Sequence, residues 1–170
     1  MLSRDVAAAR ALAERAHAGQ TDKAGRPYVE HPMRVAGRLE TPEEQVVGWL
    51  HDTVEDTDVT LRDIEAAFGP DTAAAVDAIS RREGENWHDY LARVKADPTA
   101  TRVKISDLID NSNLSRIPAV TLRDVQRQGK YNKALVYLMD GGKCRCAQLQ
   151  RTQRSRVRKQ ENGESRETQW

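Results

Sequence analysis

TPEEQVVGWLHDTVED, residues 41–56, contains the clearest helix start in this chain. Thr41 suits the N-cap position, Pro42 suits the first helical position, and Glu44 completes a capping box at the third. The residues that follow, QVVGWLHDTVED, are expected to continue the same helix. This stretch therefore predicts a long helix over residues 41–56, with an adjacent histidine and aspartate near its end.

Helix start and stop signals recur on both sides of this stretch. Further helices are expected over residues 3–18, 32–39, 61–68, 71–80, 86–96, 99–113 and 121–140. No run of alternating β-branched or aromatic residues predicts a strand. The sequence thus predicts an all-α fold, a compact multi-helix bundle.

The 170 residues suit one folded domain followed by a tail. We expect residues 1–142 to form the domain. Residues 143–170 are basic, rich in Gln, Ser, Arg and Lys, and poor in large apolar side chains. Such a segment cannot bury enough surface to offset its ordering entropy, so we expect a disordered tail. It would serve as a solubilising end or as a phosphate-seeking arm.

Composition also argues against several classes of protein. No stretch approaches the ~18 consecutive apolar residues that a membrane span needs, and charges punctuate the N-terminus, unlike a signal peptide. We therefore expect a cytoplasmic protein without a membrane partner. The net negative charge of residues 1–142 argues against nucleic acid as a partner. The oligomeric state is left open.

His51 and Asp52 are adjacent, and Glu55 and Asp56 follow one turn later. In a continuous helix these four side chains share one side. Negative side chains at a helix C-terminus oppose the helix dipole and repel one another unless a cation compensates. The cluster is therefore either a solvated acidic helix end or part of a divalent metal site.

Two further stretches favour the metal. His31 lies in YVEHP, and Asp107 lies in VKISDLIDN. The apolar residues of the second stretch are expected to anchor a largely buried helix: Val103, Ile105, Leu108 and Ile109. Its polar residues then fall along one side: Lys104, Asp107, Asp110 and Asn111. A carboxylate in such an apolar frame needs a partner, because an isolated buried charge is strongly disfavoured.

With these residues the chain resembles the HD-domain phosphohydrolases, which show a histidine, then a His-Asp pair, then an aspartate in this order. Three blocks carry the resemblance: AHAGQTDKAGRPYVEHP (16–32), WLHDTVEDTDVT (49–60) and VKISDLIDNSN (103–113). They are similar to blocks of the RelA/SpoT hydrolase domain and of the small single-domain alarmone hydrolases. Three ordered blocks are far more specific than the His-Asp pair alone.

The resemblance implies a role for each matching residue. The metal ligands would be His31, His51, Asp52 and Asp107. The acidic pair that handles the attacking water would be Glu55 and Asp56. Lys23 and Asn111 match positions that contact the nucleotide. One divalent metal, manganese foremost, is the implied cofactor, and a small-molecule nucleotide is the implied partner.

Lys130 and Tyr131 fall within one turn of the last expected helix. They either line the phosphate side of the substrate pocket or belong to a solvated basic face. We assign both to substrate binding as an expectation that the structure can test.

Two departures from the family pattern bear on the substrate. Alarmone hydrolases usually show Arg-Lys where this chain has Asp22-Lys23, and that arginine helps to hold the guanine base. They also commonly show Asp-Arg-x-His-Asn where this chain reads DLIDN, residues 107–111. The substrate therefore stays open between ppGpp, hydrolysed at its 3′-pyrophosphate, and another nucleotide phosphoester or pyrophosphate.

Metal-dependent hydrolysis of a nucleotide is thus the function that the sequence predicts. The metal would lower the pKa of bound water and polarise the phosphoryl oxygen. The alternative is an HD-fold nucleotide-binding or regulatory module with little turnover. The presence of every ligand position and both acidic residues argues against that alternative.

Overall fold

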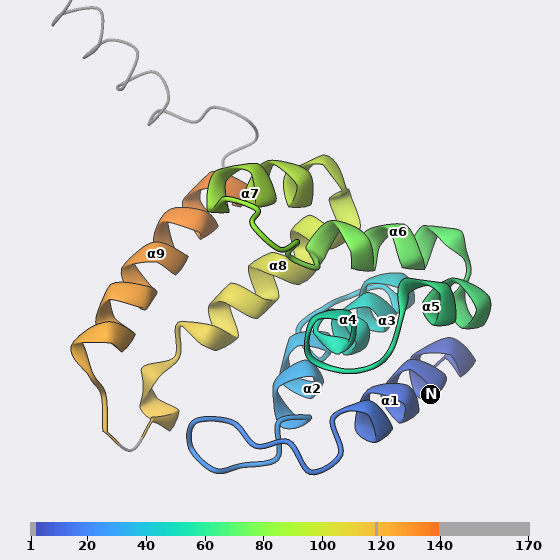
Figure 1. Cartoon of the computed structure of the whole chain (residues 1–170), viewed down its shortest axis with the longest axis horizontal. Helices are drawn as coiled ribbons and strands as arrows, with labels where there is room; N and C mark the ends of the chain where they lie inside the picture. The colour runs from blue at the N-terminus through green and yellow to red at the C-terminus, as the bar shows by residue number, and fades with distance from the viewer. Residues whose placement is uncertain (1–2, 118, 140–170) are drawn as a thin grey trace, which may run out of the picture.

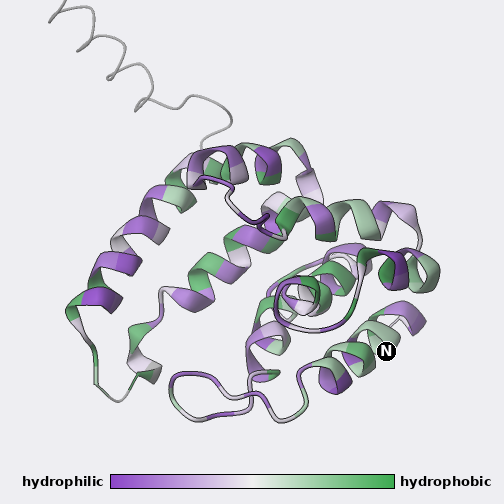
Figure 2. Ribbon diagram, viewed as in Figure 1, coloured by the Kyte–Doolittle hydropathy of each residue, from purple (hydrophilic) through white to green (hydrophobic). Residues whose placement is uncertain are grey.

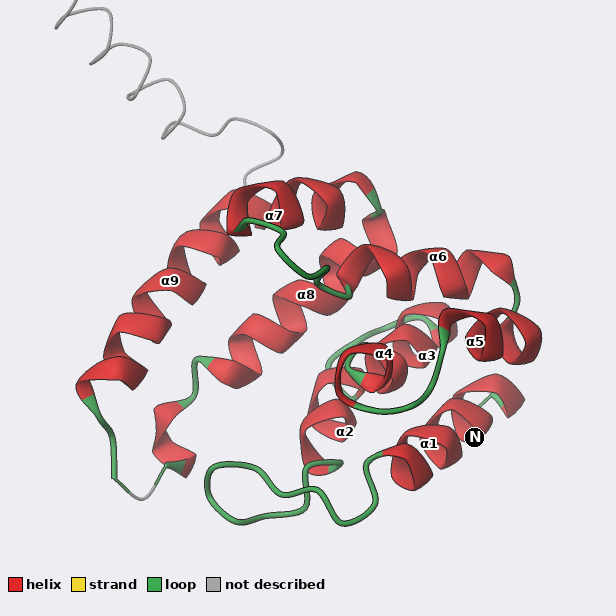
Figure 3. Cartoon of the chain, in the orientation of Figure 1, coloured by secondary structure: helices red, strands yellow, loops and turns green. Residues whose placement is uncertain are grey.

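The computed structural model describes residues 3–117 and 119–139, and every regular element within them is a helix (Figure 3). In chain order these are α1 (Arg4–Ala16), α2 (Glu30–Ala36), α3 (Pro42–Leu50), α4 (Thr53–Asp56), α5 (Leu61–Phe68), α6 (Pro70–Ile79), α7 (Trp87–Ala96), α8 (Pro98–Asn111), the 3-10 turn η1 (Leu114–Arg116) and α9 (Leu122–Met139). The predicted all-α class is confirmed. The expected disordered tail, residues 143–170, lies outside the described residues.

Side-chain caps fix where the helices begin. The Ser3 hydroxyl accepts a hydrogen bond from the backbone N–H of Val6 at 3.2 Å and caps α1. Thr41 and Glu44 form the predicted capping box at the start of α3. The Asn86 side chain accepts hydrogen bonds from the backbone N–H groups of His88 and Asp89 and caps α7. Each cap of this kind contributes about 1 kcal/mol, so the local sequence defines these helix starts before any tertiary packing.

α8 runs through the middle of the molecule (Figure 1). It packs against α2, α3, α6, α7 and α9, and α1 packs against α3. The largest fully buried apolar side chains of the core include Leu50, Ile64, Ile79, Tyr90 and Leu108. Hydrophobic and hydrophilic residues alternate along α8 and α9, as expected of helices that bury one face (Figure 2). In the part of the chain described here, none of the helices has the length and apolar character needed to cross a bilayer.

The single helix predicted over residues 41–56 is wrong, because the chain breaks between α3 and α4. Asp52 has φ −101° and ψ −7°, and α4 begins at the next residue. Two side chains bond to carbonyl oxygens at the end of α3. The Thr53 hydroxyl donates to the carbonyl of Leu50 at 2.7 Å, and the His51 ring bonds to that of Gly48 at 2.9 Å. Such local side-chain bonds compete with regular helix continuation.

α8 also differs in detail from the prediction. Val103 and Leu108 are fully buried as expected, but Ile109 is 46% exposed. Asp110 lies one turn beyond Asp107 on α8, and both carboxylates reach His31 of α2. Asp110 is buried against α2, where it contacts His31 and two arginines. The neighbours of the Asp110 carboxylate therefore depend on how α2 packs against α8.

Gly48→Ala is expected to destabilise the fold by about 1–3 kcal/mol through overpacking. A Cβ at this position would lie 2.7 Å from Cδ1 of Leu39 and 3.0 Å from Cα of Ala36, a backbone atom of α2. Chemical denaturation measures the loss. Gly129→Ala is the matched control, since its Cβ meets nothing within 4 Å and alanine favours a helix. Equal stability of Gly48→Ala and the native chain would contradict the close approach of α2 and α3.

Candidate metal centre

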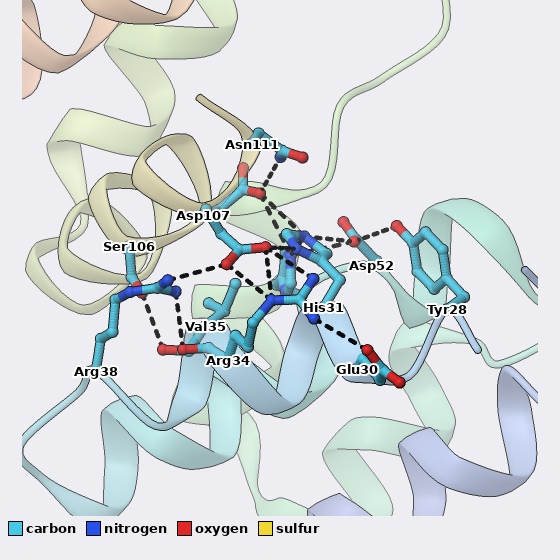
Figure 4. Close-up of polar contacts among 12 residues, drawn as sticks. Tyr28, Glu30, His31, Arg34, Val35, Arg38, Asp52, Ser106, Asp107 and Asn111 are labelled. Carbon is cyan, nitrogen blue, oxygen red and sulfur yellow. Dashed lines mark hydrogen bonds and ion pairs between the residues drawn. The ribbon is translucent and has the colours of Figure 1, made fainter. Parts of the chain in front are cut away.

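Four side chains from three parts of the chain lie close together, and Figure 4 shows three of them, His31, Asp52 and Asp107. His31 lies in the first turn of α2, His51 and Asp52 join α3 to α4, and Asp107 lies on α8. The first three residues each offer one ligand atom, and these atoms lie within 4.8 Å of one another. Oδ1 of Asp107 lies 3.1 Å from His31 Nε2 and 3.8 Å from His51 Nε2. The structure thus brings together the four residues predicted as metal ligands.

The spacing of these atoms suits one divalent metal ion. The two imidazole Nε2 atoms are 3.3 Å apart. Oδ2 of Asp52 lies 3.1 Å from His51 Nε2 and 3.5 Å from His31 Nε2. Atoms that bind a metal at about 2.0–2.2 Å in tetrahedral or octahedral geometry are separated by roughly 2.8–3.6 Å. Two imidazoles and two carboxylates also form a donor set that zinc, iron and manganese accept.

Hydrogen bonds at Nδ1 fix how both rings face the cluster. His51 Nδ1 lies 2.9 Å from the carbonyl oxygen of Gly48, and His31 Nδ1 lies 2.9 Å from Oδ2 of Asp110. Carbonyl and carboxylate oxygens only accept, so each Nδ1 carries a proton. In the neutral rings both Nε2 atoms therefore keep a lone pair aimed at the cluster, as metal ligation requires.

Charge within the cluster is balanced by protons and by a lysine. Burial opposes ionisation of Asp107, but the Lys104 ammonium 2.8 Å away and the two imidazoles hold its pKa well below the usual range. Burial alone would lower the pKa of His31, but hydrogen bonds to Asp107 and Asp110 and the charge of Asp52 raise that pKa to about 9. A bound cation would take the place of the proton on His31 Nε2.

Glu55 and Asp56 both lie on α4 but face different neighbours. Oε1 of Glu55 accepts the backbone N–H of Arg81 at 2.9 Å, and its side chain lines a cavity beside the cluster. Burial and the charge of Asp52 raise the pKa of Glu55 despite that hydrogen bond. Oδ2 of Asp56 instead accepts a hydrogen bond from the Tyr28 hydroxyl at 3.3 Å. Glu55 is therefore the carboxylate that is better placed beside the ligands.

Two adjoining cavities flank the cluster, with volumes of about 280 and 310 Å³. The first opens beside the loop between α1 and α2, and the second reaches the carboxylates of Asp52, Glu55 and Asp107. The residues predicted to contact the nucleotide all line these cavities: Lys23 the first, Lys130 the second, and Asn111 and Tyr131 both. A substrate could therefore extend from the loop to the cluster.

Basic side chains line the second cavity: Arg81, Lys104, Arg127 and Lys130. Lys104 pairs with Asp107, whereas Arg81 and Lys130 form no ion pair with any residue in the described ranges. The Lys130 ammonium instead lies 3.8 Å from the centre of the Trp87 ring. Cations without a fixed anionic partner beside a candidate metal site suit phosphate groups of a ligand.

Three residues that hold the proposed ligands in place were not predicted from the sequence: Tyr28, Arg34 and Arg38. The Tyr28 hydroxyl donates to Oδ2 of Asp52 at 2.6 Å. Arg34 and Arg38 reach Asp110, which in turn holds His31. These residues did leave a signal, because the two arginines follow His31 by three and seven positions and so share its helix face.

A family model described as HD domain matches residues 9–103. Curated relatives include the probable guanosine-3′,5′-bis(diphosphate) 3′-pyrophosphohydrolase of Synechocystis sp., 34% identical over 56% of this chain and 14% of the relative. The guanosine-3′,5′-bis(diphosphate) 3′-pyrophosphohydrolase of Vibrio cholerae is 33% identical over 59% of this chain and 16% of the relative. A GTP pyrophosphokinase of Streptomyces coelicolor is 30% identical over 77% of this chain and 16% of the relative. The chain thus spans about one sixth of the length of these curated relatives.

A solved structure shares the fold. It is described as "A metazoan ortholog of SpoT hydrolyzes ppGpp and plays a role in starvation responses". It superposes with a TM-score of 0.67 at 22% identity, covering 84% of this chain and 89% of that chain. At this identity the likeness supports the helical architecture alone.

Proposed function

This chain belongs to the HD domain family, and from that premise we propose that it is a metal-dependent phosphohydrolase acting on a nucleotide pyrophosphate, with ppGpp as the leading substrate. The observation that carries the proposal is the convergence of two imidazoles and two carboxylates beside a cavity that basic side chains line. A fold that only bound nucleotides would need the basic cavity but not the buried donor cluster.

The proposed metal ligands are His31, His51, Asp52 and Asp107, and the proposed ion is a single divalent metal, manganese first. When bound, such an ion makes a water molecule more acidic and polarises a phosphoryl oxygen. Tyr28 and Lys104 hold the two carboxylate ligands in place by direct contacts with Asp52 and Asp107. The site is therefore organised by contacts that exist before an ion enters.

Glu55 is the proposed general base. Its Oε1 is held by the backbone N–H of Arg81, so Oε2 is the atom that accepts the proton of the attacking water. The raised pKa of Glu55 brings its basicity closer to neutral pH, which favours proton transfer. Asp56 would act indirectly, because its carboxylate bonds to the hydroxyl of Tyr28, which also donates to Asp52.

The cavities support a ligand that carries phosphates at one end and a nucleoside at the other. Lys104 and Lys130 would face the phosphates near the cluster, and Lys23 and Asn111 would contact the rest of the nucleotide. The 3′-pyrophosphohydrolase names of the relatives agree with a pyrophosphate leaving group. We therefore place ppGpp first and another nucleotide phosphoester second.

Asp22 bears on which base is bound. Its Oδ1 accepts the backbone N–H groups of Ala24 and Arg26 at 2.8 and 2.9 Å, so this carboxylate shapes the loop that borders the first cavity. It cannot supply the cationic contact that an arginine makes with guanine. Selectivity for guanine would then depend on the other residues that line the first cavity.

A turnover screen tests the proposal. Metal-loaded protein is incubated with ppGpp, pppGpp, nucleoside mono-, di- and triphosphates, and a generic phosphodiester, and the products are separated by ion exchange. We expect ppGpp to give GDP and pyrophosphate. If only another nucleotide is hydrolysed, that nucleotide and not ppGpp is the substrate. If nucleotides bind but none is hydrolysed, the chain is a binding module and not an enzyme.

A further inference from the structure

We propose that Asp110 is a positioning residue of the metal centre, whose carboxylate holds the His31 imidazole with Nε2 facing the other three ligands. The inference rests on the proposed metal-dependent function, but it concerns a residue outside the ligand set. Asp110 occupies the position where alarmone hydrolases commonly show histidine.

The carboxylates of Asp107 and Asp110 on α8 contact opposite edges of the His31 ring. Oδ1 of Asp107 lies 3.1 Å from His31 Nε2, and Oδ2 of Asp110 lies 2.9 Å from His31 Nδ1. Asp107 and Asp110 are three residues apart, so one helical turn of α8 presents both to the ring on α2. All three side chains are less than 10% exposed. The ring therefore cannot turn without losing a buried hydrogen bond.

Two arginines of α2 fix Asp110 as an anion. Arg34 donates from Nε to Oδ1 at 3.0 Å and from a terminal nitrogen to Oδ2 at 3.1 Å (Figure 4). Arg38 donates to Oδ1 at 3.0 Å. Both guanidinium groups, together with the His31 ring, hold the pKa of Asp110 well below its usual range even though burial opposes ionisation. These hydrogen bonds hold the carboxylate against the His31 ring.

These contacts also explain why Asp107 and not Asp110 serves as the ligand. Both oxygens of Asp110 already accept hydrogen bonds from His31, Arg34 and Arg38. A carboxylate that is saturated in this way acts on the ion only through the histidine it orients. Such outer carboxylates fix the tautomer of a ligating histidine, and their loss typically costs about 10- to 100-fold in metal affinity.

Asp110→Asn tests the inference in the full chain. The amide keeps the size of the side chain but weakens the acceptor opposite Nδ1. We expect metal affinity to fall by about 10- to 100-fold. Asp71→Asn is the matched control, since it makes the same substitution at an exposed carboxylate in the first turn of α6 that lines neither cavity. Its metal affinity should stay within a few-fold of the native value, with circular dichroism confirming that both variants fold.

A second measurement does not depend on the variants. Nitrogen-15 NMR of the native chain, metal-free and zinc-loaded, reports which imidazole nitrogen of His31 holds the proton and which one binds zinc. We expect a proton on Nδ1 in both states and zinc at Nε2. A neutral ring protonated at Nε2, zinc bound through Nδ1, or unchanged affinity in a folded Asp110→Asn protein would overturn the role. Failure of the chain to bind zinc would instead refute the proposed function, while the metal-free spectrum would still test Asp110.

Discussion

Glu55→Gln is expected to lower turnover of the nucleotide substrate by about two to four orders of magnitude while metal content stays unchanged. Glutamine keeps an oxygen that can accept the Arg81 N–H, so the local structure of α4 should survive. What it loses is the basic Oε2 atom and one negative charge beside Asp52. Steady-state kinetics, together with metal analysis of the same sample, measures both consequences.

Asp58→Asn is the matched control for this variant. It removes an exposed carboxylate two residues beyond α4 that lines neither cavity, and it should leave turnover unchanged. Asp56→Asn should have a smaller effect than Glu55→Gln, because Asp56 contacts Tyr28 and lines neither cavity. Nearly normal turnover in Glu55→Gln with metal retained would remove Glu55 from the reaction. Loss of metal in that variant would make Glu55 a ligand.

Asp107→Ala is expected to reduce bound metal from about one ion per chain to almost none after dialysis, because it removes one of the four proposed ligands. It also removes the buried partner of Lys104 and an acceptor of His31. Breaking a buried pair by deleting one partner typically costs about 3–5 kcal/mol, so the unfolding midpoint should fall as well. Elemental analysis and denaturation are both needed.

Lys104→Met separates these two effects. It breaks the same buried ion pair with Asp107 but removes no proposed ligand, so the protein should lose stability and still retain the metal. Equal metal content in the native chain and in folded Asp107→Ala protein would take Asp107 out of the ligand set. Loss of metal from both variants to the same degree would show that the ion pair, and not ligation, controls binding.

Much of this architecture follows from local sequence. The absence of strand patterns predicted the helical class. Several helix starts were predicted within a few residues, at Ser3, Thr41 and Asn86, because a cap depends on neighbours a few positions away. The four donor residues were also predicted, since the order of the three blocks is specific. Their convergence is then a consequence of α2, α3 and α8 packing together.

Most other features depend on contacts between distant segments, which local patterns do not contain. The break between α3 and α4 is local, because His51 and Thr53 bond to carbonyl oxygens three residues earlier. The different neighbours of Glu55 and Asp56, by contrast, are Arg81 and Tyr28, which lie 26 and 28 positions away. The direction of Asp110 depends on Arg34 and Arg38, which lie more than 70 positions earlier. A hydropathy pattern on α8 alone could not place that carboxylate.

A metal titration of the stripped chain tests the central claim most directly. Manganese is added stepwise to metal-free protein, and the rate of pyrophosphate release from ppGpp is measured at each step. We predict no turnover before addition, a linear rise up to about one ion per chain, and a plateau beyond it. His51→Ala should stay inactive throughout, because it lacks one imidazole ligand. Full turnover in the stripped chain, or a titration that gives the same plateau in His51→Ala, would contradict the account.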